Sequence, residues 1–117
     1  MRLLGLVAGT LYAQALAIND AGQIVGLGET GTSNLGFYTA PRIGLKFLKG
    51  LGGKASVGNA INQSGVIVGY AEDATNATYA VRWLTSTSRP EVFSTAAGNA
   101  LGINNLGQIV GFGYFGQ

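Results

Sequence analysis

The sequence contains no histidine and no cysteine among its 117 residues, and these two absences remove many kinds of functional site. A Ser-His-Asp triad needs histidine, a thiol nucleophile or a disulfide needs cysteine, and a Cys/His zinc site needs at least one of the two. We find no catalytic motif in what remains. The protein is therefore predicted not to be an enzyme, and no metal or cofactor is expected.

Charge and long apolar runs are also scarce. Seven Lys/Arg and five Asp/Glu residues give a net charge of +2. So small a charge does not produce the electrostatic footprint of a nucleic-acid-binding protein. No apolar run reaches the roughly 18 residues of a membrane-spanning helix, so we expect no membrane span. Hydrophobic residues make up 47% of the chain, which is enough for a packed core and excludes disorder through low hydrophobicity.

Glycine is abundant, with 20 residues, but it does not follow the Gly-x-y period of collagen. Many glycines instead belong to a motif that occurs three times, beginning at Ile18, Ile61 and Ile103, at offsets of 43 and 42 residues. The motif reads Ile-Asn-x-x-Gly-x-Ile-Val-Gly, and six of its nine positions are identical in all three copies. This internal repeat is the strongest signal in the sequence.

The motif predicts a β-hairpin. Asn begins a tight turn because its side chain bonds back to the backbone, and the first Gly occupies a left-handed position in a bulged hairpin. The Ile-Val that follows favours a strand, which we expect to end one or two residues after the last Gly. Adjacent strand residues point to opposite faces, so both faces are expected to be covered. The predicted hairpins are 16–18 with 23–27, 58–61 with 66–71, and 101–103 with 108–112.

Further strands are predicted between the hairpins, at 37–40 and 78–84 and then, more briefly, at 45–48 and 91–93. No segment shows a helical period. Four strands in a repeat of about 42 residues match the size of a propeller blade. We predict an all-β fold of about 2.7 antiparallel four-stranded repeats arranged as β-propeller-like blades. The alternative is a three-fold β-trefoil-like barrel.

The chain is interpreted as one repeat domain, residues 1–117. It divides into a partial repeat 1–26, repeats 27–69 and 70–111, and a short tail 112–117. A ring propeller normally needs at least four blades, so further copies or neighbouring repeats are expected partners. Residues 1–15 are open to two interpretations. Their layout is that of a secretory signal ending in Ala-Gln-Ala, but residues 14–19 align with 99–104, which favours a strand.

Residues 17–26 and 79–83 resemble the bacterial HAF repeat, a family of probable extracellular repeats. Its pattern joins Ala-x-x-Ile-Asn-x-x-Gly-x-Ile/Val-Val-Gly to an aromatic strand with a His-Ala-Phe-like start and a Trp. This chain lacks the His, keeps the Trp only as Trp83, and interrupts the first aromatic block with Pro41-Arg42. The resemblance implies bacterial origin, a secreted or cell-surface location and a repeated β-fold, and it implies no defined activity.

The candidate ligand-binding residues are Tyr79, Arg82 and Trp83, because aromatic rings stack on sugars and both Trp and Arg are favoured in interfaces. A Trp in such a strand is, however, more often part of the core. The expected function is a non-catalytic extracellular β-repeat module with a structural role or a glycan- or protein-binding role.

Two other functions are open. Glu29 and Glu72 each follow the last Gly of a motif by three residues, and a carboxylate pair is what a polysaccharide-cleaving enzyme uses. Residues 42–54 carry four basic residues near aromatics and could bind anions or nucleic acid. In both cases solvated surface side chains are the simpler explanation. Asp20 in the first motif suggests a calcium loop, but one carboxylate is too few ligands.

Overall fold

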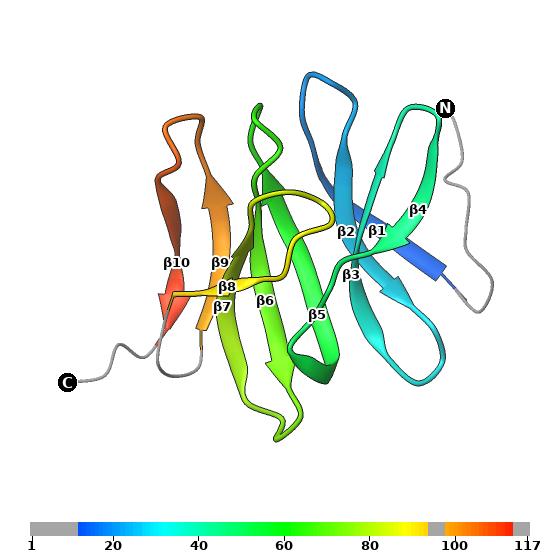
Figure 1. Cartoon of the computed structure of the whole chain (residues 1–117), viewed down its shortest axis with the longest axis vertical. Coiled ribbons are helices and arrows are strands. Elements are labelled where there is room, and N and C mark those ends of the chain that lie inside the picture. Colours follow the sequence, from blue (N-terminus) through cyan, green and yellow to red (C-terminus); the bar gives the residue numbers. More distant parts are fainter. Residues whose placement is uncertain (1–11, 94–97, 114–117) are drawn as a thin grey trace.

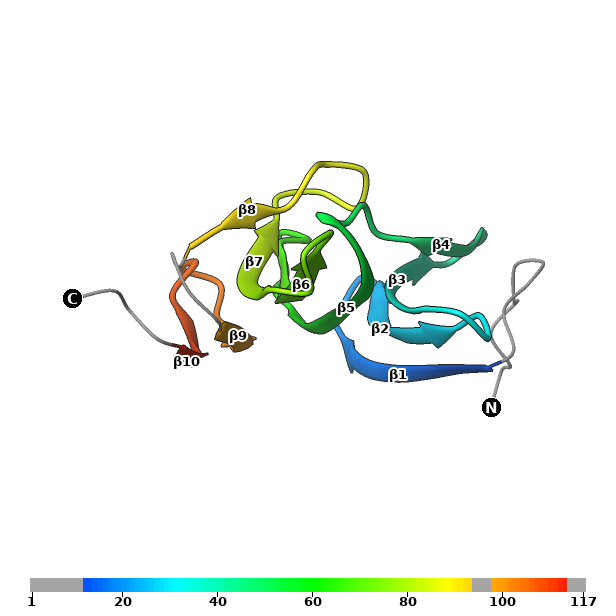
Figure 2. The same ribbon diagram turned by 90° about the horizontal axis from the view of Figure 1, so that it is seen from below.

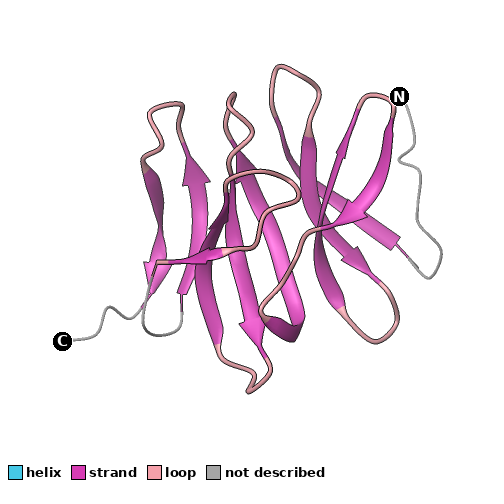
Figure 3. Cartoon of the chain, viewed as in Figure 1, coloured by secondary structure: helices cyan, strands magenta, loops and turns pink. Residues whose placement is uncertain are grey.

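The structure is a computed structural model, in which residues 12–93 and 98–113 are described. Every regular element in these residues is a β-strand (Figure 3), so the expected all-β fold is confirmed. The strands are β1 (Tyr12–Ile18), β2 (Ile24–Glu29), β3 (Asn34–Ala40), β4 (Ile43–Phe47), β5 (Gly52–Ile61), β6 (Ile67–Asp73), β7 (Thr78–Trp83), β8 (Glu91–Val92), β9 (Gly98–Ile103) and β10 (Ile109–Gly113).

The strands form two antiparallel meanders and a separate hairpin. β1 to β4 pair in chain order, β5 to β8 do the same, and β9 pairs with β10. A single parallel bridge between Asn34 and Ala55 joins the two meanders. The sheets of the described residues do not close into a barrel. The structure therefore does not confirm the closed three-fold form that we kept as an alternative. In the described residues, β9 and β10 pair only with each other.

Each copy of the motif forms the turn of a hairpin: β1–β2 is the first hairpin, β5–β6 the second and β9–β10 the third. In the first turn, the Asn19 Oδ1 atom accepts hydrogen bonds from the backbone N–H groups of Ala21 at 3.1 Å and Gln23 at 3.0 Å. Gly22 has a φ of 80°, a conformation that favours glycine. The other two turns repeat these bonds, and Gly65 and Gly107 have φ values of 87° and 83°.

The strand after each turn runs past the last Gly of the motif and ends one or two residues beyond the predicted ends at 27, 71 and 112. β2 continues to Glu29 and β6 to Asp73. The last Gly is instead required by the facing strand, where a β-bulge between Ala15 and Ala17 shifts the register. The bulge brings the Gln14 carbonyl so close to Gly26 that a Cβ atom there would collide with it. The carbonyls of Val57 and Asn99 lie in the same way against Gly69 and Gly111.

Successive hairpins pack face to face, with their tight turns at the same end of the molecule (Figure 1). In the second hairpin, Ile67 faces back toward the first hairpin and Val68 faces forward to the third, and neither is exposed to solvent. The expectation that both faces of the Ile-Val strand are covered is therefore correct for the second hairpin and wrong for the third, where Val110 is 67% exposed. The residues buried around Ile67 form the first core: Val25, Tyr38, Leu48, Ile61, Ile67, Ala71, Val81 and Trp83. Those around Val68 form the smaller second core: Val68, Ala80 and Ala100.

The two ends of the molecule are built from different elements. The first meander lies at one end, and the hairpin β9–β10 lies at the other end, packed on the second meander (Figure 2). In the described residues the third hairpin has no third or fourth strand beside it, whereas the first two hairpins do. The third hairpin is thus covered on one face only, by the second meander.

Candidate functional site

The predicted ligand-binding residues of β7 do not share one face of the strand. Tyr79 and Trp83 point toward the first core, and Arg82 lies on the opposite face, as the alternation of a strand requires. Trp83 is completely buried, and its Nε1–H donates a hydrogen bond to the Lys49 carbonyl at 2.8 Å. The structure therefore gives Trp83 the packing role that was its alternative explanation.

Arg82 instead joins β7 to β8. Its Nε atom forms an ion pair with Glu91 Oε1 at 2.6 Å, and both side chains are more than a third exposed. The guanidinium also lies 6.0 Å from the centre of the Phe93 ring, a distance at which a cation–π attraction operates. Arg82 thus holds the end of β8 and the phenyl ring of Phe93 in place.

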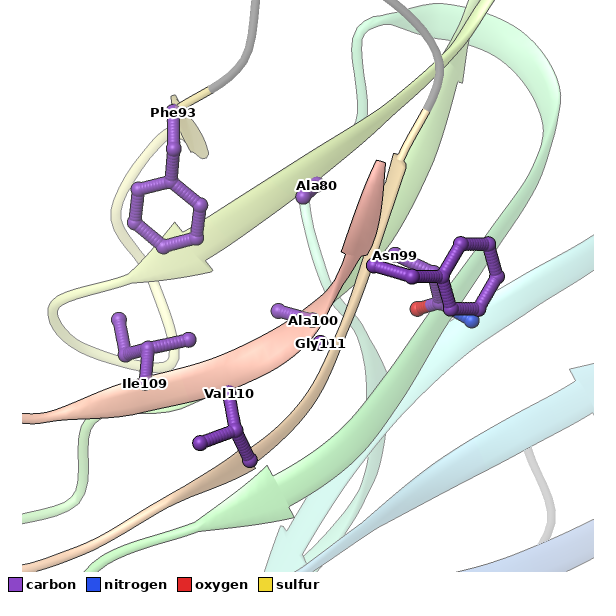
Figure 4. A pocket seen from close by; sticks show the side chains of 8 residues that line it. Ala80, Phe93, Asn99, Ala100, Ile109, Val110 and Gly111 are labelled. Atoms are coloured by element: carbon purple, nitrogen blue, oxygen red, sulfur yellow. The ribbon is translucent and has the colours of Figure 1, made fainter. Parts of the chain in front are cut away.

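Phe93 borders an apolar pocket of about 460 Å³ beside the third hairpin. The pocket is lined by β7, the end of β8 and the hairpin β9–β10. In Figure 4 the Ile109 side chain points to the side of the hairpin on which Phe93 lies, and the Val110 side chain points to the other side. Its lining residues are Ala80, Phe93, Asn99, Ala100, Ile109, Val110, Gly111 and Phe112. Sequence analysis missed this pocket because its walls come from three separate segments.

The lining of the pocket offers hydrophobic contact and little chemistry. Among the described residues, the one polar side chain of the lining is that of Asn99, whose Oδ1 accepts a hydrogen bond from Asn59 Nδ2 at 2.8 Å. Phe93 is 40% exposed and Phe112 62% exposed, so both rings are accessible to a ligand. No titratable side chain of residues 12–93 and 98–113 lines the pocket. Such a lining can hold an apolar surface or stack against a ring.

Glu29 and Glu72 occupy equivalent positions on β2 and β6, where they pair with Asn34 and Thr78 of the following strands. Glu72 Oε1 accepts a hydrogen bond from the backbone N–H of Lys54 at 3.1 Å. Within residues 12–93 and 98–113, no hydrogen bond joins the two carboxylates, and no group of three acidic side chains could hold a metal ion. The structure does not bring the carboxylates into contact.

The basic segment 42–54 follows β3. Arg42 lies in the turn before β4 with a φ of 67°, and Lys46 lies on β4, which pairs only with β3 in the described part of the chain. Arg42, Lys46, Lys49 and Lys54 are all exposed. Exposed lysines on an edge strand oppose edge-to-edge aggregation, which agrees with the solvated interpretation. In the same part of the chain, no helix is long and apolar enough to span a bilayer.

The three motif turns are linked sideways by hydrogen bonds that we name the turn ladder. Asn19 Nδ2 donates to the Asn62 carbonyl at 2.9 Å, and Asn62 Nδ2 donates to the Asn104 carbonyl at 3.1 Å. A second row uses the residue after each Asn. The N–H of Asp20 donates to Gln63 Oε1 and the N–H of Gln63 donates to Asn105 Oδ1, both at 2.9 Å. Motif position three looked variable, but its Asp, Gln and Asn all carry a side-chain oxygen.

The turn between β6 and β7 has the same form as the motif turns but begins with Asp73. Asp73 Oδ1 accepts hydrogen bonds from the N–H and Oγ1 of Thr75 and from the N–H of Ala77. Asn76 takes the left-handed position, with a φ of 70°. The hydrogen bond from the Thr75 side chain, followed by those from the two backbone groups, lowers the pKa of Asp73 below 3.8.

Comparison of the chain with protein-family models, with curated proteins and with solved structures finds no match.

Proposed function

We propose that this chain is a non-catalytic extracellular β-repeat module whose first role is structural. The turn ladder carries this proposal. Its polar side chains, Asn19, Asn62 and Gln63 among them, donate or accept hydrogen bonds from one hairpin to the next. A polar network used in this way fixes the spacing and orientation of repeated units.

The units are proposed to be blades of a propeller-like assembly. β1 to β4 and β5 to β8 each form an antiparallel meander of four strands, which is the topology of a blade. Two such units and one hairpin are fewer than the four blades that a ring needs. Further units would therefore have to come from other copies or from neighbouring repeats.

A bacterial, secreted or cell-surface location remains a proposal that rests on the HAF-like pattern of residues 17–26 and 79–83. The structure bears on where a signal peptide could be cleaved. Tyr12–Ile18 forms β1, so cleavage after Ala15 would remove the first four residues of this strand. Most of the proposed signal segment, residues 1–11, lies outside the described residues.

Ligand binding is a second candidate role, favoured by the apolar pocket. A glycan or protein ligand would contact the accessible rings of Phe93 and Phe112, while the Arg82 guanidinium attracts the Phe93 ring from 6.0 Å. Among the binding residues expected from the sequence, Arg82 would thus affect a ligand only through Phe93. Tyr79 and Trp83 pack in the first core and stabilise β7.

Incubation with neutral and anionic polysaccharides, followed by assay of reducing ends, tests the non-catalytic role. Wild type and the double variant Glu29→Gln, Glu72→Gln should release reducing ends at the same background rate. A rate that is clearly above background in wild type and lost in the double variant would contradict the proposal and favour the carboxylate enzyme.

Binding of the same polysaccharides tests the second role. The pocket predicts that Phe112→Ala weakens binding and that the double variant Lys46→Gln, Lys49→Gln does not. The reverse result, with steep dependence on salt, would favour the basic segment as an anion-binding site.

A further inference from the structure

The third hairpin has a face that resembles a buried interface but is open to solvent. Val25, Val68 and Val110 occupy the same motif position in the three hairpins. Val25 and Val68 are 0% exposed, whereas Val110 is 67% exposed. The first two are covered by the first strand of the following unit: a Cβ atom at Gly58 of β5 would lie 3.0 Å from Val25. Val68 packs in the same way against Ala100 of β9.

The first hairpin has the complementary open face. Ile18 and Ile61 are equivalent motif residues, and each faces the side on which a preceding unit would lie. Ile61 is 8% exposed because the first unit covers it, whereas Ile18 is 65% exposed. The same chain therefore has an exposed forward face at Val110 of the third hairpin and an exposed backward face at Ile18 of the first hairpin.

The turn ladder ends in complementary polar groups. At the third turn, Asn104 Nδ2 donates to Gln108 Oε1 and, within the described residues, to no following turn. At the first turn, the Asn19 carbonyl accepts from Gly22 of its own turn, and no preceding Asn donates to it there. Donors thus remain at the third turn and acceptors, including the Asp20 carboxylate, at the first.

We propose that the third hairpin of one copy binds the first hairpin of a second copy, in the arrangement that joins successive hairpins inside the chain. Val110 would pack beneath β1 of the partner subunit. Asn104 Nδ2 would donate to the carbonyl of Asn19 of the partner subunit, and the Asn105 N–H would donate to Asp20 of the partner subunit. The second copy is the occupant because the chain itself already builds this interface twice, at the first–second and second–third junctions.

The proposed contact is head-to-tail, so each copy uses two different surfaces. Such an interface forms a ring if the rotation between copies closes, and a filament if it does not. It does not depend on glycan binding or on the absence of catalysis, and it uses neither Glu29 nor Glu72. Its failure would therefore leave the reducing-end assay and its interpretation unaffected.

The oligomeric state, measured by light scattering over a range of protein concentrations, is the first test. Wild type should associate as concentration rises, and Val110→Asp should weaken association at least about tenfold because it places a charge in an apolar contact. Val110 is 67% exposed in the single chain, so the variant should fold. The matched control is Val92→Asp on β8, which is 46% exposed and lies outside the proposed contact. A wild type that stays monomeric, or equal association of Val110→Asp and wild type, would overturn the proposal.

Cross-linking tests the head-to-tail geometry. The chain has no cysteine, so Asp20→Cys and Asn105→Cys each introduce a unique thiol at an exposed turn position. A short bismaleimide should link the two variants when they are mixed, because residues at this motif position are neighbours across each internal junction. Each variant alone should give no dimer. Efficient linking of either variant to itself would show a two-fold interface and rule out the proposed one.

Discussion

The second and third hairpins share one motif but differ sharply in burial. Both have the same turn, the same bulge and the same close approach at the last glycine, Gly69 in one and Gly111 in the other. Yet Val68 is fully buried, whereas its equivalent Val110 is largely exposed. The difference teaches that the motif specifies the shape of a hairpin, while burial depends on the units on either side.

The leading Asn of each turn shows the same contrast. Asn62 is 5% exposed, caps its own turn, accepts the first turn's ladder bond on its carbonyl and donates the next one from its side chain. Asn104 makes the same local bonds and accepts the ladder bond from Asn62, but it is exposed, and in the described residues its Nδ2 donates only to Gln108 of its own turn. The Asn62 side chain therefore links two turns, whereas the Asn104 side chain bonds only within its own turn in the described residues.

The largest effect is expected from the aromatic side chains of the two regions. Trp83→Ala should lower the free energy of unfolding by about 4 kcal/mol, because it opens a large cavity in the first core and removes the hydrogen bond to Lys49. Phe112→Ala on β10 should cost under about 1 kcal/mol because Phe112 is 62% exposed. Urea denaturation measures both. Similar losses for the two variants would contradict the contrast between the regions.

A smaller effect is expected from the equivalent valines. Val68→Ala should destabilise the chain by about 2 kcal/mol, the cost of two lost methyl groups and the space that they leave. Val110→Ala should change stability by no more than about 0.5 kcal/mol if the measurement is made at a concentration low enough to keep single chains. Thermal unfolding of the two variants and of wild type, at the same low protein concentration, measures both changes in stability. An equal shift would mean that Val110 is already covered in the single chain.

The smallest effect is expected at the turn between β6 and β7, which has the form of the motif turns but begins with Asp73 instead of Asn. Hydrogen bonds in the folded state lower the pKa of Asp73, so its contribution to stability is present above the pKa of the unfolded chain, about 3.8. That contribution is lost as the pH falls below 3.8 and through the folded-state pKa. Asp73→Asn should keep the turn, as Asn does in the motif, and should remove this part of the pH dependence.

Melting temperature measured between about pH 2 and 6 tests this expectation. The wild-type protein should lose more stability over the acidic part of this range than Asp73→Asn loses. Parallel curves for the two proteins would show that the Asp73 carboxylate has no linkage to folding.

The sequence predicted the all-β class and the positions of most strands because these depend on residues close together in the chain. It placed the end of the second strand of each hairpin one or two residues early, and it did not explain why Gly26, Gly69 and Gly111 lie inside these strands. The reason for those glycines is a carbonyl of the facing strand, brought there by a bulge whose residue differs between copies: Leu16, Asn59 and Leu101. No pattern in the motif signals that bulge.

The candidate site was less accessible to sequence analysis. Tyr79, Arg82 and Trp83 were grouped by type, but strand alternation alone separates Arg82 from the other two. The pocket combines β7, Phe93 and the third hairpin, which only packing brings together. The turn ladder could have been noticed from the side-chain oxygen shared by Asp20, Gln63 and Asn105.

What the sequence by itself determined is the hairpin. An Asn, a left-handed Gly and an Ile-Val pair lie within nine residues, so the energies that form the turn act over a few bonds of the same segment. What only the tertiary structure decided is which faces of those hairpins are covered. Asn19 and Asn62, and Asn62 and Asn104, are 43 and 42 residues apart, and their contacts exist only after whole units have packed. Identical motif residues therefore become core in one hairpin and open surface in another, because burial depends on the neighbouring units and not on the motif.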